Sequence, residues 1–376
     1  MIFFLYEIFD INILQYVTFR AAAAAITALM ISFLLGPKII RTLQNRQIGE
    51  SIRENGPSSH YLKEGTPTMG GIIIILSIIL PTILWSRYDN MFIWTISLST
   101  LMMGIVGFID DYLKIVKKYS KGLIARYKLI AQVCVGAFVS IMVLNCIDNP
   151  KIFIDSAGDL IKEISNTSIS LPFIVNGFLS LPKWLYVLLI ILVVTATSNS
   201  VNLTDGLDGL ATGLSAISLL TFGAIAYASG RTDFSDYLNI LYIKGADELL
   251  VFCFAAIGAC LGFLWYNSYP AMVFMGDTGS LALGTAIGTL SLLLRKEILL
   301  IIIGGVFVVE SLSVIAQVSY FKYTKRKYGK GKKIFLMAPI HHHFELTGLP
   351  ESRVVVRFWI IGILLALFSL SSFKLQ

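Results

Sequence analysis

Ten mostly apolar runs, separated by short polar segments, limit what this chain can fold into. Most of them approach the ~20 residues that an α-helix needs to cross a bilayer. Hydrophobic residues make up 56% of the 376 and charged residues only 14%, whereas soluble domains carry about 25% charged residues. The sequence therefore predicts an all-α, polytopic integral membrane protein with about ten transmembrane helices. The runs cover residues 18–37, 70–86, 91–109, 129–147, 183–201, 209–229, 248–265, 280–294, 297–321 and 354–373, of which 280–294 is the weakest because it is short and rich in glycine.

Lys and Arg are unevenly divided between the two sets of loops. Nineteen lie on the side that contains the segments after the first, third and ninth runs, and ten lie on the other side. Because cytoplasmic loops carry the excess of positive charge, the first side is predicted to be cytoplasmic and both termini to lie outside, in the periplasm. The net charge of +7 is interpreted as loop charge facing anionic lipid, not as a nucleic-acid surface. The first 19 residues contain two acids and no Lys or Arg, so no signal peptide is expected.

The chain shows no internal repeat and no long linker, so one domain over residues 1–376 is predicted. The segment 150–182 is interrupted by prolines and polar residues, and it is expected to be an external excursion containing a short hairpin. The segment 322–353 is expected to be a cytoplasmic basic and His-rich loop. The four cysteines form no C-x-x-C pattern, so packing is favoured over a disulfide framework or a zinc site.

Aspartates lie at or just beyond several of the run ends that are predicted to face the cytoplasm. A carboxylate at membrane depth is costly and usually has a functional reason. Several at one face indicate a place where a cation, a phosphate and a membrane-borne substrate meet. They are Asp110, Asp111, Asp205, Asp208 and Asp277.

The first two acidic motifs are F-I-D-D-Y-L-K and N-L-T-D-G-L-D-G-L. Asp110 and Asp111 are adjacent, so on a helix they point about 100° apart and can serve different partners. A helix end solvated beside Lys114 is the alternative. In the second motif, Asn202, Asp205 and Asp208 are spaced three apart and would share a helix face, where they could read a sugar or base or help to hold a metal. A polar turn with Asp as helix N-cap is the alternative.

The motif F-M-G-D-T-G-S places Asp277 between two glycines just before a run. This arrangement suits a divalent ion near a helix N-terminus, with backbone N–H groups available to phosphate oxygens. Simple capping by Asp277 or Thr278 is the alternative. The preceding W-Y-N-S-Y-P supplies aromatic faces and the amide of Asn267, which could accept a base.

Three further segments carry polar groups. In P-I-H-H-H-F-E, the adjacent imidazoles of His341 to His343 cannot all bind one metal, so a donor role near a diphosphate is favoured over zinc. K-E-G-T-P-T-M-G-G could bring Lys63 and Thr68 to a phosphate or only cap a helix. Glu310, Ser313 and Gln317 share one helix face, where interhelical hydrogen bonding is the simpler interpretation.

The joint occurrence of these motifs in this order closely resembles the bacterial phospho-N-acetylmuramoyl-pentapeptide transferase family, within the polyprenyl-phosphate N-acetylhexosamine-1-phosphate transferase superfamily. The resemblance covers nearly the whole chain and is weakest over 150–182. The aspartate motifs are shared across the superfamily, whereas the Lys63 loop and the triple-His run indicate the muramoyl branch.

The resemblance implies an enzyme of the cytoplasmic (inner) membrane that acts in peptidoglycan synthesis, and so in cell-wall formation, cell shape and cell division. It would transfer phospho-MurNAc-pentapeptide from UDP-MurNAc-pentapeptide to undecaprenyl phosphate, giving lipid I and UMP, with Mg²⁺ as cofactor. Oligomeric state stays open, with a homodimer among the alternatives.

Site roles follow from the same resemblance. Asp277 and Asn202 are expected to bind the metal, and Asp110, Asp111, Asp277 and His341 to be catalytic, with Asp110 as base. The residues expected to bind substrate are Lys63, Thr68, Lys114, Lys128, Asn199, Asp205, Asp208, Asn267, Phe274 and Gln317.

Three alternatives remain open at this point. A covalent phospho-aspartate could replace the single in-line displacement that is preferred here. A GlcNAc-1-phosphate transferase of the same superfamily would differ in its sugar donor. A secondary transporter also places acids at membrane depth, but usually near the midplane and often within paired repeats, which this chain lacks.

Overall fold

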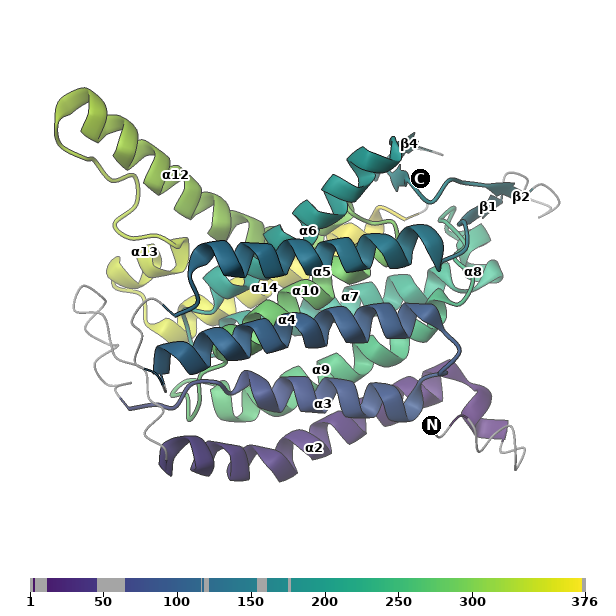
Figure 1. Ribbon diagram of the computed structural model, residues 1–376, viewed down its shortest axis with the longest axis horizontal. Coiled ribbons are helices and arrows are strands. Elements are labelled where there is room, and N and C mark those ends of the chain that lie inside the picture. The colour runs from purple at the N-terminus through teal and green to yellow at the C-terminus, as the bar shows by residue number, and fades with distance from the viewer. Residues whose placement is uncertain are drawn as a thin grey trace.

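The computed structural model describes residues 3, 12–45, 65–115, 117, 122–153, 161–174 and 177–373. Within these ranges the chain is almost entirely helical, with four three-residue strands (Figure 1). The elements are η1 (Asn12–Gln15), α2 (Val17–Asn45), α3 (Gly71–Trp85), α4 (Met91–Ile115), α5 (Ala125–Asn145), β1 (Lys151–Phe153), β2 (Ile161–Glu163), β3 (Ser168–Ser170), β4 (Phe178–Ser180), α6 (Lys183–Thr204), α7 (Leu210–Ser229), α8 (Thr232–Tyr237), η3 (Ala246–Glu248), α9 (Leu249–Asn267), α10 (Gly276–Leu293), α11 (Leu299–Ile303), α12 (Gly305–Tyr328), α13 (Ile340–Leu346) and α14 (Glu351–Ser371).

Eight of the described helices are long and apolar enough to cross a membrane. This confirms a polytopic helical membrane protein. The apolar helix α3 has only 15 residues, and α10 falls outside this set. The helices that qualify are α2, α4, α5, α6, α7, α9 with its preceding turn, α12 and α14.

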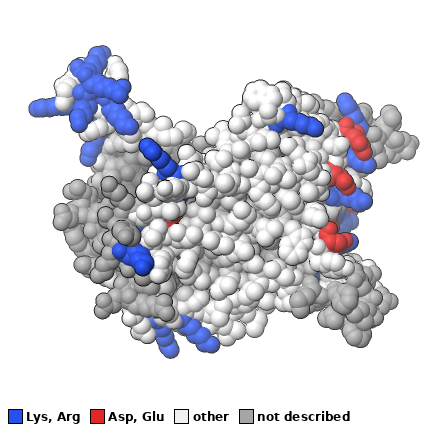
Figure 2. Space-filling model, in the orientation of Figure 1, with Lys and Arg blue, Asp and Glu red and all other residues white. Residues whose placement is uncertain are grey.

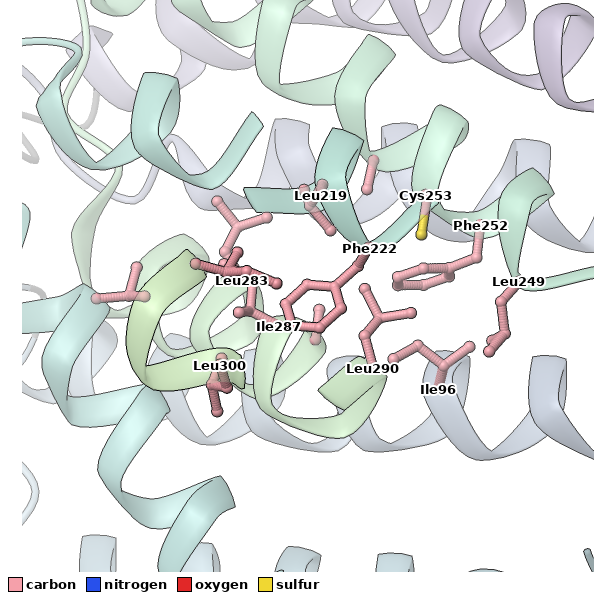
Figure 3. Close-up of a cluster of buried hydrophobic side chains, with 14 of the residues drawn as sticks. Ile96, Leu219, Phe222, Leu249, Phe252, Cys253, Leu283, Ile287, Leu290 and Leu300 are labelled. Carbon is pink, nitrogen blue, oxygen red and sulfur yellow. The ribbon is translucent and has the colours of Figure 1, made fainter. Parts of the chain in front are cut away.

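The weakest predicted span, 280–294, corresponds to the central helix α10. Every residue from Thr278 to Leu293 is buried, so α10 faces protein and needs little hydropathy. Its small residues permit close packing, as in other membrane helix interfaces: a Cβ on Gly284 would lie 2.5 Å from the carbonyl oxygen of Thr197 on α6. Figure 3 shows large apolar side chains of α7, α9 and α10 pointing toward one another in the core beside it.

The ninth predicted run, 297–321, is broken in the structure. α11 ends at Ile303, and after Gly304 the chain continues as α12 to Tyr328, which extends the helix into the predicted basic loop. α12 projects away from the bundle, and α13 lies below its outer part (Figure 1). The basic side chains after Phe321 therefore lie on a projecting helix end (Figure 2).

The other end of the bundle carries the expected excursion, which forms two antiparallel hairpins, β1–β2 and β3–β4. The start of α2 and the end of α14 lie at this same end (Figure 1). This end also contains buried charged groups that bind one another. Arg20 donates to both carboxylate oxygens of Glu248, while Arg295 donates to Tyr186, whose hydroxyl donates to Glu297 over 2.8 Å.

Candidate active site

Three helices bring polar side chains to the N-terminus of α10, where Asp277 lies. Its Oδ2 accepts hydrogen bonds from Lys114 Nζ of α4 at 2.8 Å and Lys128 Nζ of α5 at 3.0 Å. Its Oδ1 accepts one from Asn202 Nδ2 of α6 at 2.7 Å, and the same amide reaches Ser280 Oγ at 2.8 Å. Residues separated by up to 163 positions thus meet at one carboxylate.

Asp111 caps the same helix end from a neighbouring helix. Its two oxygens accept the backbone N–H groups of Asp277 at 3.1 Å and Thr278 at 2.9 Å, and the Thr278 hydroxyl at 2.6 Å. A carboxylate at this place satisfies otherwise unpaired donors and interacts favourably with the helix dipole. α4 and α10 approach closely because Gly107 has no side chain: a Cβ there would lie 2.7 Å from the Cα of Thr278. Asp111 therefore orients Asp277.

Asp110 lies beside this cap and shares a lysine with Asp277. Its Oδ2 accepts Lys114 Nζ at 2.8 Å and lies 3.6 Å from Lys128 Nζ, while its Oδ1 accepts the backbone N–H of Leu123 at 2.6 Å. The carboxylate is buried, with a side chain 3% exposed, but Lys114 is 39% exposed. Two carboxylates thus lie against two lysines at an edge that solvent reaches.

The oxygen-rich donors here suit a hard divalent cation. Carboxylates and amide oxygens are ligands of Mg²⁺, which usually binds one or two protein carboxylates and completes its shell with water and phosphate oxygens. The described part of the chain holds no cluster of three or more His, Cys, Asp or Glu side chains that could bind a metal alone. Asp277 with Asn202, and Asp110 beside them, fit a cation that shares its coordination with a substrate.

Two of the predicted substrate residues hold the turn between α6 and α7. Asp208 Oδ2 accepts the backbone N–H of Ala271 at 3.0 Å, and Asn267 Oδ1 accepts Gly209 N–H at 3.1 Å and the Thr212 hydroxyl at 3.0 Å. The N-cap of α7 is Gly209, without a side-chain cap, so Asp208 links the turn to the segment after α9 instead. Asp205 lies half-buried at the start of this turn.

Other predicted residues lie around these groups. Thr68 is buried near Gly276, and its loop pairs with the following motif because Phe274 N–H donates to Pro67 at 2.8 Å and Gly70 N–H donates back to Phe274 at 2.9 Å. On α6, Asn199 donates to Gln132 at 3.2 Å. Lys63 lies outside the described residues.

Gln317 and His341 take up bridging or buried positions at the end of the bundle where α12 and α13 lie. Gln317 holds the chain returning from α12: its Oε1 accepts Ile334 N–H at 2.9 Å and Phe335 N–H at 3.0 Å. His341 is fully buried, with Nδ1 3.1 Å from Glu310 Oε2. Neither residue bonds directly to Asp277 among the contacts of the described chain.

Several contributing residues were missed by sequence reasoning. Ser280 bonds Asn202, and Glu351 Oε1 accepts the backbone N–H of Asp208 at 2.7 Å. Ser280 lies one turn after Gly276, at the end of the motif F-M-G-D-T-G-S, and was open to notice. Glu351 lies 143 positions from its partner, and no sequence pattern indicates that pairing.

Similarity to known proteins defines the class of this protein. Residues 93–295, more than half of the chain, match Glycosyl transferase family 4, so the fold and site are those of a polytopic membrane transferase. Residues 63–75 match the phospho-N-acetylmuramoyl-pentapeptide-transferase signature 1.

Relatives named phospho-N-acetylmuramoyl-pentapeptide-transferase are similar over nearly their full length. The protein of Gemmatimonas aurantiaca is 48% identical over 97% of this chain and 96% of its own. That of Thermodesulfovibrio yellowstonii is 48% identical over 97% and 96%, and that of Parabacteroides distasonis is 42% identical over the whole of both chains. The chain belongs to the phospho-N-acetylmuramoyl-pentapeptide-transferase family.

Proposed function

We propose that this protein transfers phospho-MurNAc-pentapeptide from UDP-MurNAc-pentapeptide to undecaprenyl phosphate, forming lipid I and UMP in peptidoglycan synthesis. The observation that carries the proposal is the convergence of Asp277, Asp110, Lys114 and Lys128 at one solvent-accessible edge of a membrane helix bundle. Joining two anionic phosphates requires positive charge at that point, and a membrane-borne acceptor requires the point to lie at the bilayer surface.

The basic end of the bundle is assigned to the cytoplasm. The last part of α2 and the projecting end of α12, which both carry Lys and Arg, lie at one end of the bundle, and the start of α2 and the end of α14 lie opposite (Figures 1 and 2). The end of α4, whose Lys114 binds Asp277, lies at the first of these ends. Ten crossings, with α3 and α10 added to the eight long apolar helices, are consistent with termini in the periplasm. The enzyme would then lie in the cytoplasmic (inner) membrane and meet its nucleotide donor from the cytoplasm.

The side chains around the N-terminus of α10 have distinct roles in the proposed reaction. Asp277 and Asn202 would hold Mg²⁺, and a bound Mg²⁺ screens the charge of the diphosphate. Lys114 and Lys128 move from carboxylate to phosphate oxygens as substrates enter, because ammonium groups pair with either anion. Asp110 accepts any proton of the lipid phosphate, whose oxygen then attacks the donor phosphorus in one in-line step while UMP leaves.

The single displacement is preferred because a phosphate oxygen is already nucleophilic once its charge is screened. Incubation with the UDP donor alone tests it: no phosphorylated aspartate should form. A trapped phosphoryl group on Asp110 or Asp277 would establish the covalent route instead.

The proposed function is tested by UMP release from purified enzyme with undecaprenyl phosphate and Mg²⁺. UDP-MurNAc-pentapeptide should support turnover and UDP-GlcNAc should not. Turnover only with UDP-GlcNAc would identify a GlcNAc-1-phosphate transferase. Transport into proteoliposomes without UMP release would identify a transporter.

A further inference from the structure

A glutamate lies beside Nδ1 of each of the first two imidazoles of the triple-His run. Glu310 of α12 lies 3.1 Å from Nδ1 of His341, and both side chains are fully buried. Glu345 of α13 lies 2.8 Å from Nδ1 of His342, whose side chain is 12% exposed. The two rings meet edge to face with centroids 4.2 Å apart. A carboxylate on Nδ1 fixes the orientation of an imidazole and leaves Nε2 to act elsewhere.

Both Nε2 atoms face the same point on the turn between α6 and α7. A Cβ on Gly206 would overlap Nε2 of His341 and would lie 3.4 Å from Nε2 of His342. Glycine is therefore needed at 206 for space, since its backbone is not in the left-handed region. The imidazole pair and the turn fit closely only without a side chain there.

The second half of this turn is held by hydrogen bonds to other parts of the chain. Glu351 accepts the N–H of Asp208, whose carboxylate accepts Ala271 N–H, and Asn267 accepts Gly209 N–H. These bonds fix residues 208 and 209, whereas Gly206 rests against the imidazoles. Asp205, just before it, donates its backbone N–H to Val201 at the end of α6 over 3.1 Å. The path of the turn at Gly206 thus depends on where the two rings lie.

The cost of burial indicates that the Glu310–His341 pair has a purpose beyond packing. Neither carboxylate oxygen of Glu310 has an aligned hydrogen bond within the described part of the chain, and neither ring nitrogen of His341 has one. A buried ionisable pair is weak evidence for stability, because apolar side chains of similar size often stabilise a protein equally well.

We propose that Glu310 and Glu345 are positioning residues that act through His341 and His342 to set the position of the turn at Gly206, next to Asp205, for binding the nucleotide half of the donor. This inference rests on the proposed function. The two Glu–His pairs would hold the donor-binding turn in place. Loss of either pair should therefore weaken binding of the donor and leave binding of the lipid acceptor unchanged.

A double-mutant cycle tests the inference, with UMP affinity measured by calorimetry and the KM of each substrate measured by UMP release. Glu310→Ala and His341→Ala should each weaken UMP binding about tenfold. Losses of about this size are seen when the hydrogen-bond partner of a metal-binding side chain is removed. The double variant should be no weaker than either single variant, because Glu310 acts through His341. The KM for undecaprenyl phosphate should change less than twofold.

Two further variants guard against a general loss of structure. Glu310→Gln keeps the shape and an acceptor oxygen, so it should recover most of the affinity. Glu297→Gln removes another buried carboxylate, at the opposite end of the bundle, and should leave UMP affinity unchanged. Additive losses in the cycle, or equal losses for donor and acceptor, would overturn the inference. Failure of the proposed function would appear differently, as wild-type enzyme that releases no UMP.

Discussion

The two ends of the helix bundle both contain buried acids paired with basic residues, but the pairs are built differently. The outer end is the one that carries the start of α2 and the end of α14. There, Arg20 and Glu248 form a bidentate pair whose side chains are 2% and 3% exposed. Glu248 also accepts the backbone N–H of Arg87 at 2.7 Å. At the opposite, inner end, Asp277 accepts one hydrogen bond from Lys114 and one from Lys128, and the side chains of these lysines are 39% and 17% exposed.

This difference separates a structural pair from an exchangeable one. An arginine fork that matches both oxygens of a carboxylate is rigid and specific, whereas a lysine is a mobile point charge. Because these lysines are partly exposed, the proposed reaction has incoming phosphate groups replace the carboxylates as their partners. Equal changes at the two ends should therefore affect different properties, stability at the outer end and catalysis at the inner end.

The largest effect is expected for Asp277→Asn. It removes the charge that holds both lysines and would hold Mg²⁺, so turnover should fall ~10³-fold, the upper end of the range seen when one main electrostatic group is lost. UMP release over a Mg²⁺ titration measures this. The unfolding temperature should stay close to that of wild type. Normal Mg²⁺-dependent turnover in this variant would refute the metal assignment.

At the outer end, Glu248→Gln should destabilise the protein by about 3 kcal/mol, because Arg20 stays buried without its counter-charge. Thermal unfolding in detergent measures the loss. The turnover of the molecules that remain folded should match wild type, since this end lies opposite the site. A fall in turnover without loss of stability would contradict the division between the two ends.

Much of this arrangement is predictable from the sequence. Long apolar runs indicate helices directly, and nine of the ten predicted runs correspond to single helices. The orientation inferred from the loop charge stays a prediction. The motif around Asp277 was also interpretable, because Gly, Asp and Thr before an apolar run mark a helix start near an anion site. The position of Asp111 was harder to predict, because Asp111 caps α10 through a hydrogen bond between residues 166 positions apart.

Other features depend on packing that a single sequence does not express. The helix α10 has low hydropathy because protein surrounds it, and only the fold reveals this. Asp208 was expected to bind substrate, with helix capping as the alternative. Its carboxylate accepts the backbone N–H of Ala271 and does not cap α7, and its substrate role stays a prediction. His341 was expected at a diphosphate, and the fold buries it against Glu310. Each outcome follows from a contact between distant helices, which local spacing leaves undetermined.

Lys114→Met should have a smaller effect than loss of Asp277. Lys128 would still face both carboxylates, at 3.0 Å and 3.6 Å, so turnover should fall about tenfold, comparable to losing one charged hydrogen bond of 1.5–3 kcal/mol. Lys128→Met provides the matched comparison at the same carboxylate. If the lysines exchange between carboxylate and phosphate, both variants should also show a higher KM for undecaprenyl phosphate, and an unchanged KM in both would exclude that exchange.

The smallest effect is expected for the exposed pair Arg87–Asp89 at the outer end, where two hydrogen bonds of 3.2 Å and 2.9 Å join side chains 46% and 55% exposed. The hydrogen bond from the Arg87 guanidinium lowers the pKa of the Asp89 carboxyl. A lowered pKa adds stability above the ordinary value of about 3.9 and loses it as the pH falls through the lowered one. Asp89→Asn should therefore cost about 0.5 kcal/mol at pH 7, a figure typical of exposed pairs, and nothing at strongly acid pH. Unfolding temperatures of variant and wild type across that range measure the difference, and a loss as large as that of Glu248→Gln would show that burial is not what separates the two pairs.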